Sequence, residues 1–297
     1  MVRCLRLMPV LLASAVASQA FADAFVDGVW RFVPGPFAGF GQRRLPWIVL
    51  GPPQGLGFLA GGTDVLSLGE GGEITIAFRD NVVVDGPGPD FVIYENAFHS
   101  GDQSGPVFTE FAFVAVSSDR KIWYQYPHDP ATGDGLAGQT PVLANSASGI
   151  DPFAPDAGGD RFDLADLGVD YVSYVRIVDV GGAIADAGDL VAPGDKGGFD
   201  LDAVGAIHSL ATGSVSGTVT SRGQPVVHAR VKLVPSGSGR KLRRRTGGDG
   251  RFVFRSVVPS GGYLLKARRS GAGKAVAGLV VDADHLEVAI DPELASP

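Results

Sequence analysis

Acidic and amide side chains stand at both ends of one short apolar run, and these residue types could hold a cation. Asp90 precedes the run Phe91–Tyr94, and Glu95 and Asn96 follow it directly. The run has the length and composition of a buried strand. Asp and Asn are common in turns, but carboxylate and amide oxygens are also the ligands that calcium prefers. Both interpretations are open at this point.

A second acidic pair occurs later, in the segment GGFDLDAV (197–204). Strand alternation places Asp200 and Asp202 on one face, where two carboxylates repel unless water, a basic partner or a cation lies between them. The alternative to a cation is that both acids are solvated or paired with Arg79 or Arg176. If this strand lies beside the apolar run, the sequence predicts a calcium site whose ligands come from Asp90, Glu95, Asn96, Asp200 and Asp202.

Two further acidic loops, 151–166 and 179–195, match no calcium-loop spacing, so turn formation is their expected role. In the first, Asp163 precedes LADLG and is expected to cap a short helical turn. The histidines form no H-E-x-x-H motif, and G-x-S-x-G does not occur. Nothing singles out a carboxylate pair for glycoside cleavage, which depends on distances in space. A non-catalytic role is therefore preferred, and a secreted hydrolase using loop carboxylates is the rival.

Aromatic side chains are the other candidates for ligand contact, because sugars stack on them. In IWYQY (122–126), alternation places Ile122, Tyr124 and Tyr126 on one face and Trp123 on the other. One set is expected in the core and the other at the surface, so Trp123 and Tyr124 are the candidate glycan contacts. The alternative is that these rings simply pack the interior.

The N-terminus has the features of a secretory signal peptide. Arg3 and Arg6 precede a short apolar core, and a small-x-small pattern predicts cleavage after Ala22. That core is far shorter than the ~20 residues of a membrane span, and no later stretch is long and apolar enough. Cys4 is the single cysteine, so the expected mature protein has no disulfide, reactive thiol or Cys-ligated zinc. A net charge of −7 disfavours nucleic acid as a partner and suits divalent cations.

Short apolar alternations separated by Gly- and Pro-rich turns predict an all-β chain. Such segments recur up to residue 208 and predict a jelly-roll-like β-sandwich over 23–208. Small polar residues at 209–214 predict a linker, after which basic residues become more frequent. Alternation resumes over 215–293, where a second, smaller β-sandwich is expected.

The segment after this linker resembles the carboxypeptidase regulatory-like (transthyretin-like) domain. The resemblance lies in SGTVTSRGQPVVHARVKL (216–233) and TGGDGRFVFRSVVPSGGYLLKA (246–267), which follow the family's order of G-x-V, A-x-V, D-G-x-F-x-F and G-x-Y-x-L. It covers nearly all of the smaller predicted domain. The resemblance implies a transthyretin-like or Ig-like sandwich that acts as a non-catalytic accessory or adhesive module.

The segment before the linker resembles a domain of bacterial exported and cell-surface proteins that has no assigned function. VLGPPQG (49–55), GPGPDFVIYENAF (86–98) and GGFDLDAV (197–204) carry this resemblance. YVRIVDV (174–180) and GGFDLDAV are also similar to the late strands of galactose-binding-like jelly rolls. In those domains an acid on the last strand often joins a structural calcium site.

These observations predict an exported protein, located in the periplasm, at the cell surface or outside the cell, that binds or adheres without catalysis. Calcium is the expected cofactor, and a polysaccharide or cell-surface glycan is the expected partner. A purely structural component of the envelope is a further alternative. No oligomeric state is predicted.

Overall fold

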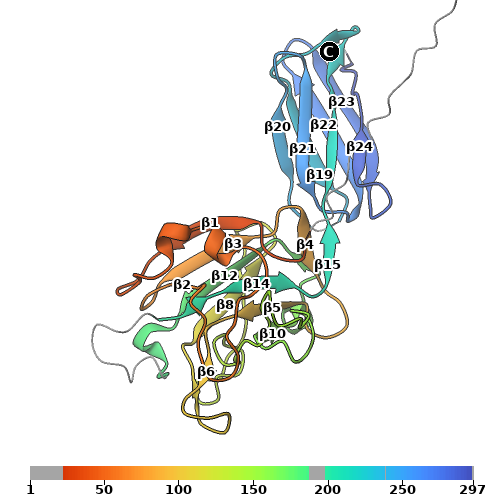
Figure 1. The fold of residues 1–297 in the computed structure, drawn as a ribbon. Helices are drawn as coiled ribbons and strands as arrows, with labels where there is room; N and C mark the ends of the chain where they lie inside the picture. Colours follow the sequence, from red (N-terminus) through yellow and green to blue (C-terminus); the bar gives the residue numbers. More distant parts are fainter. Residues whose placement is uncertain (1–22, 187–197, 238, 296–297) are drawn as a thin grey trace, which may run out of the picture.

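Two separate groups of buried apolar side chains divide the chain into two β-sandwiches, which lie end to end in Figure 1. The computed structural model describes residues 23–186, 198–237 and 239–295. The predicted signal peptide, residues 1–22, lies outside the described residues. Within the described part of the chain, no helix is long and apolar enough to cross a membrane.

One layer of the N-terminal sandwich is a five-stranded antiparallel sheet. Its strands, in spatial order, are β1 (Gly28–Val33), β3 (Glu73–Ala77), β12 (Tyr174–Asp179), β8 (Ala112–Ser117) and β9 (Tyr124–Gln125). Alternation decides which face is buried. Ile74 and Ile76 of β3 lie opposite Ile177 and Val175 of β12, and all four are fully buried.

The facing layer consists of short strands in three groups. In spatial order these are β10 (Asp160–Phe162), β5 (Phe91–Tyr94) and β14 (Ala203–Ala206); β11 (Tyr171–Val172), β4 (Asn81–Val84) and β15 (Ser209–Ala211); and β13 (Asp200–Leu201) with β2 (Leu66–Ser67). β5 is central in its group and buried on both faces. Phe91 and Ile93 contribute to the main core, whereas Val92 and Tyr94 pack in a second cluster. This double burial explains its unbroken apolar sequence.

Short elements connect these strands. They are the hairpin of β6 (Phe98–His99) and β7 (Val107–Phe108) and the 3₁₀ helices η1 (Gln42–Arg44), η2 (Trp47–Val49), η3 (Leu164–Leu167) and η4 (Gly181–Ala183). The Asp163 side chain accepts a hydrogen bond from the Ala165 N–H at 2.8 Å, so the predicted cap of η3 is confirmed. Gly168 ends this helix with a φ of 62°, which a glycine adopts without strain.

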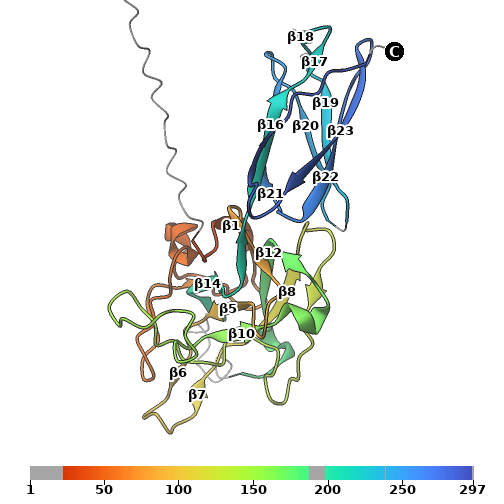
Figure 2. The same cartoon turned by 90° about the vertical axis from the view of Figure 1, so that its right-hand side faces the viewer.

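The C-terminal sandwich combines a three-stranded and a four-stranded sheet (Figure 2). The first contains β21 (Arg251–Val257), β16 (Gly213–Thr218) and β24 (Glu287–Ala289), and the second contains β20 (Leu242–Arg245), β19 (Arg230–Pro235), β22 (Gly261–Arg269) and β23 (Gly273–Val281). A small hairpin joins β17 (Thr220–Ser221) to β18 (Gln224–Pro225). Alternation buries Val231, Leu233, Leu265 and Ala267 in one core with Phe252 and Phe254. The predicted all-β architecture of two sandwiches is confirmed.

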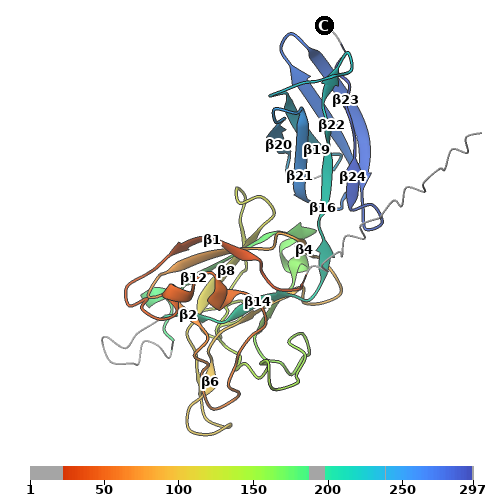
Figure 3. The same ribbon diagram turned by 45° about the horizontal axis from the view of Figure 1, so that its top comes forward.

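The junction between the sandwiches is shorter than the predicted linker, 209–214. Residues 209–211 form β15, which pairs with β4, and β16 begins at Gly213 and continues into the C-terminal sandwich (Figure 3). Thr212 is held between them, because its N–H donates to Asp80 O and its hydroxyl donates to Arg79 O. Residues 209–211, whose small polar side chains predicted part of a linker, thus belong to a strand that pairs with the edge of β4.

We expect the N-terminal sandwich to fold as a fragment that ends at Thr212, and to be less stable when it ends at His208. The shorter fragment loses β15, the antiparallel partner that covers one edge of β4. Thermal unfolding of both fragments gives the difference between their midpoints, and each kcal/mol lost from the free energy of unfolding lowers the midpoint by about 2–4 °C. Equal midpoints would contradict a stabilising role for β15, and a poorly dispersed amide NMR spectrum of the longer fragment would contradict the boundary.

A candidate cation site among buried carboxylates

Buried aspartates in the N-terminal sandwich are held by backbone N–H groups. Asp179, at the end of β12, is 4% exposed and accepts three such bonds of 2.7–2.8 Å, from Gly71, Gly181 and Phe199. Asp160, in β10, accepts two backbone bonds and one hydroxyl bond, from Gly138, Gln139 and Thr140. Each carboxyl group therefore joins loops that are distant in the sequence. Burial raises the pKa of Asp160, and its hydrogen-bond donors oppose that shift.

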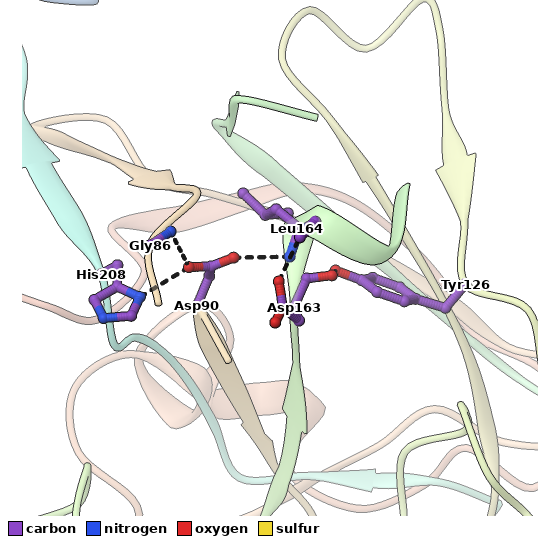
Figure 4. A network of polar contacts seen from close by, with 7 residues as sticks. Gly86, Asp90, Tyr126, Asp163, Leu164 and His208 are labelled. Atoms are coloured by element: carbon purple, nitrogen blue, oxygen red, sulfur yellow. Dashed lines mark hydrogen bonds and ion pairs between the residues drawn. The ribbon is translucent and has the colours of Figure 1, made fainter. Parts of the chain in front are cut away.

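Asp90 is the most completely enclosed of these acids, at 0% exposure. One carboxylate oxygen lies 2.8 Å from both the Gly86 N–H and His208 Nδ1, and the other accepts from the Leu164 N–H at 2.7 Å (Figure 4). Tyr126 adds a hydroxyl bond to the neighbouring Asp163 carbonyl. Asp90 thus connects the loop before β5, the start of η3 and the turn between β14 and β15.

Asp85, Asp90 and Asp163 form a carboxylate cluster whose oxygens lie within 4.8 Å of one another. Both oxygens of Asp90 already accept hydrogen bonds from the protein. Asp163 caps η3, and Asp85 is exposed. This cluster is therefore explained by turn and cap formation, and it leaves no buried oxygen for an ion.

A different situation is found at the other end of β5. Glu95 is 3% exposed, and its Oε2 is buried without a hydrogen-bond partner. Asn96 Oδ1 and Asp200 Oδ1 are also buried and unpartnered. The Asn96 and Asp200 side chains meet, with Nδ2 and Oδ2 3.4 Å apart. Three acceptor oxygens are thus withdrawn from water without a donor, which is costly unless another group compensates.

The electrostatics of this end of β5 are dominated by negative charge. Burial raises the pKa of Glu95 well above its ordinary value, and the charges of Glu110 and Asp200 raise it further. Burial together with Asp200 raises the pKa of Glu110 to about 9. Burial raises the pKa of Asp200 to about 6, although hydrogen bonds from Ser67 and Asn96 oppose the shift. Without a compensating cation, these acids can be accommodated only by taking up protons.

The loop before β2 packs directly on this group. A Cβ atom at Gly61 would lie 2.4 Å from Asn96 Oδ1, so the loop backbone approaches the amide in a way that only glycine allows. Asp202, two residues beyond Asp200, instead accepts the Gln54 N–H at 2.8 Å. Burial raises the pKa of Asp202 to about 7.

The structure therefore divides the five predicted ligands. The Asn96 and Asp200 side chains are in contact, and Glu95 lies near enough for the charge of Asp200 to raise its pKa. Asp202 lies nearby but is bound to the Gln54 N–H. The prediction that Asp90 shares their ion is wrong, because Asp90 lies about 17 Å away along β5 and has donors for both oxygens.

Glu110 belongs to the group but was not predicted from the sequence. It is 8% exposed and precedes the apolar strand β8. A single acid directly before a buried strand was a weak signal, because such acids usually remain solvated at the strand end.

Oxygen ligands from Glu95, Asn96 and Asp200, with Glu110 alongside, match the chemistry of a hard divalent cation. Calcium takes six to eight oxygen ligands from carboxylates, amides, carbonyls and water, and it tolerates irregular geometry. A bound cation would satisfy the three orphaned oxygens and offset the charge that raises the carboxyl pKa values. The residues present therefore fit calcium.

The predicted aromatic contacts lie on opposite faces of the five-stranded sheet. Tyr124 is 40% exposed and pairs with Val116, a core residue, so it lies at the rim of the buried face. Trp123 is half-buried on the outer face, with the Arg176 guanidinium 4.4 Å from its ring centre. Trp123 and Tyr124 therefore cannot form one flat strip.

A second tryptophan, Trp30 of β1, is 56% exposed. The guanidinium of Arg120 covers its ring at 3.4 Å from the centroid and lies 5.0 Å from that of Tyr174. Trp30 and Trp123 are thus two tryptophans that each pack against an arginine.

Comparison with known protein families identifies the C-terminal sandwich. Residues 214–294 match the family model of the carboxypeptidase regulatory-like domain, in agreement with the resemblance seen in the sequence. Among curated proteins, none matches the chain at a significant level.

Several solved structures resemble parts of the chain, with low overall similarity. A DUF3823 family protein from Parabacteroides merdae is 18% identical over 28% of this chain and 46% of its own, with a TM-score of 0.23. The dioxygenase domain of a dioxygenase–carbohydrate-binding protein fusion from Streptomyces is 20% identical over 28% of this chain and 79% of its own, with a TM-score of 0.23. The pilus 2b backbone protein of group B streptococcus is 12% identical over 75% of this chain and 93% of its own, with a TM-score of 0.25.

We expect Asp90→Asn to lower the free energy of unfolding by about 3 kcal/mol, because the amide keeps only one accepting oxygen and sets an NH2 donor against an N–H group that the carboxylate now binds. Asp85→Asn is the matched control, since Asp85 is exposed. Urea titration of both variants provides the comparison. Equal effects would show that Asp90 does not join the three loops.

Proposed function

We propose that this chain is an exported, non-catalytic binding protein whose N-terminal sandwich is stabilised by calcium. The ion is held by Glu95, Asn96 and Asp200, with Glu110 alongside. The observation that carries the proposal is the set of three buried oxygens without a donor. Export rests on the signal peptide predicted at residues 1–22.

The contrast with other buried acids supports a cation at this place. Asp90, Asp160 and Asp179 each accept three hydrogen bonds. Glu95 and Asp200 each keep an unpartnered oxygen in the same sandwich. Because these three aspartates have donors on both carboxylate oxygens, a bound cation is the simplest partner for the oxygens that Glu95 and Asp200 leave unbonded.

The rival proposal, a hydrolase that uses paired carboxylates, is supported less well. A general acid or base must come within hydrogen-bond reach of the bond that it cleaves. Glu95 and Glu110 are 3% and 8% exposed, so a polymeric substrate has little access to them. A raised pKa is expected for a catalytic acid, but here it follows from burial among other acids.

A glycan is the proposed partner of the N-terminal sandwich. The outer face of the five-stranded sheet carries Trp123 against Arg176, and Trp30 is exposed beside Arg120. A guanidinium that packs against one face of a ring holds its orientation. We propose that a sugar stacks on the other face of these rings.

Calcium should raise the unfolding midpoint of the mature protein. A ligand that binds only the folded state adds about 2.7 kcal/mol at 100-fold excess over Kd. Magnesium should act less, because it demands a smaller octahedral site. Glu95→Gln should abolish the calcium response and also stabilise the calcium-free protein at pH 8, since it removes a carboxyl group that folding must either bury as a charge or protonate at a cost. Ordinary damage to the fold would not produce both effects.

Asp200→Asn should also weaken the calcium response, and Asp249→Asn, at an exposed site in the C-terminal sandwich, should leave it intact. Differential scanning fluorimetry and calorimetric titration measure these effects. If sodium at matched ionic strength shifts the midpoint as much as calcium, or if titration shows no saturable binding, the cation proposal is rejected.

The calcium-free protein should lose stability as pH rises from about 5 to 8. The pKa values of Asp200, Asp202 and Glu110 are raised to about 6, 7 and 9. Between the ordinary and the raised pKa, the folded state binds more protons than the unfolded state, so the free energy of unfolding falls with rising pH. Because calcium replaces these protons, its stabilising effect should grow over the same range. A calcium effect that is constant across this range would contradict the assignment.

Trp123→Ala should abolish binding on a glycan array and change the unfolding midpoint little. Tyr124→Ala, on the other side of the sheet, is the control and should bind normally. If Trp123→Ala instead costs about 3–5 kcal/mol of stability, the ring belongs to the core and is not a ligand contact.

A further inference from the structure

The outer face of the four-stranded sheet in the C-terminal sandwich carries cations in register. Arg230 of β19 lies directly opposite Arg245 of β20 and Arg268 of β22, and Arg268 lies opposite Lys274 of β23. All four are exposed. One row of four positive charges therefore crosses the whole sheet.

A second row follows two residues along each strand. Lys232 lies opposite Arg243 and Lys266, and Val276 completes the row on β23. The residues between the rows, such as Val231 and Ala267, are buried in the core. Alternation therefore fixes both rows on the solvent face. These seven residues, Arg230, Lys232, Arg243, Arg245, Lys266, Arg268 and Lys274, are named the basic ladder.

The basic ladder is not neutralised within the protein. Among the described residues, none of its members forms an ion pair with a carboxylate. Like charges placed directly opposite each other on a sheet are destabilising. The whole segment 214–294 carries 14 Lys and Arg against six Asp and Glu, whereas residues 23–213 carry nine against 26. Repulsion among these cations lowers the stability of the domain, and no carboxylate of the described residues offsets it. This indicates that an anionic ligand from outside the protein does so.

Spacing and shape define the kind of ligand. Neighbouring strands lie about 4.8 Å apart, so each row spans about 14 Å, and the rows are separated by about 7 Å. A depression of about 670 Å³ lies at the first row and is lined by Arg230, Arg245, Arg268, Arg269 and Lys274. A linear polymer with regularly spaced negative charges fits across such rows.

Two observations favour a polysaccharide over nucleic acid. Proteins that bind single strands supply aromatic rings on which bases stack, and no aromatic residue occurs at the register positions of the two rows. Tyr263 of β22 faces the core and is 5% exposed. The predicted export of the chain also places it with envelope polymers.

We infer that the basic ladder binds a linear anionic polysaccharide, one that carries carboxylate groups along its chain. This site lies on a different domain from the cation site and the tryptophans, so it stands or fails independently of them. Binding is electrostatic, and its affinity falls as salt displaces the polymer.

The test uses the full mature protein and sodium polygalacturonate as the probe, with calorimetric titration across a salt series. The variant Arg230→Gln with Arg268→Gln removes two central charges and keeps part of each aliphatic stem. It should bind roughly tenfold more weakly, and the slope of log affinity against log salt should fall by about two. Its unfolding midpoint should be unchanged or higher, because repulsion within the first row is reduced.

The matched control removes two charges elsewhere in the same domain, as Arg222→Asn with Arg251→Gln. Arg251 lies on the other sheet, and Arg222 has a φ of 53°, which asparagine tolerates. The control should bind as the native protein does. The inference would be overturned if both double variants lost the same affinity for polygalacturonate. It would also be overturned if the ladder variant unfolded at a lower temperature than the native protein.

Two alternative partners are tested in the same series. If oligo(dT) binds more tightly than polygalacturonate with the same number of charges, the ligand is nucleic acid and the inference is overturned. Sedimentation that shows self-association through the ladder would identify the acidic sandwich of a second copy as the partner, with the same consequence. Binding of neutral dextran at equal affinity would also contradict it.

Discussion

The N-terminal sandwich depends on carboxylates that are buried and bonded to backbone N–H groups. Its layers contain many short strands, so loops must be held by something other than long ladders of hydrogen bonds. Asp90, Asp160 and Asp179 serve this purpose by joining segments up to 118 residues apart. Each is stable in the interior because donors surround its charge. The same device explains why acids border so many apolar segments of the sequence.

At the proposed cation site, some buried side-chain oxygens have no hydrogen-bond donor. Glu95 is buried in the same way and Asp200 is partly buried, but each keeps a buried oxygen without a partner, and Asn96 adds a third. A cation would supply there what backbone N–H groups supply elsewhere. The ion would also connect the end of β5 to β13. The two sandwiches use charge differently: acids hold segments together inside the N-terminal sandwich, whereas the basic ladder of the C-terminal sandwich faces solvent.

Periodicity in the sequence was sufficient to predict both sandwiches, the buried strand 91–94 and the cap at Asp163. It also placed Glu95, Asn96 and Asp200 near one another, because residues at the ends of neighbouring strands share an edge. It could not separate Asp90 from them, since residue type does not reveal which carboxylate will find backbone donors. Glu110 was missed because its proximity depends on how the two layers pack. The sequence showed the basic ladder only as an increase in basic residues after residue 214, since its rows need the strand register.

The central claim is that Glu95, Asn96 and Asp200 bind one calcium ion. The most direct measurement is a crystal structure of the protein grown with calcium, in which anomalous scattering locates the ion. The account predicts one peak bonded to side-chain oxygens of Glu95, Asn96 and Asp200 at about 2.3–2.6 Å. The account would be contradicted by the absence of a peak at these residues when calcium is present at millimolar concentration, with the buried carboxyl groups hydrogen-bonded to each other as acids.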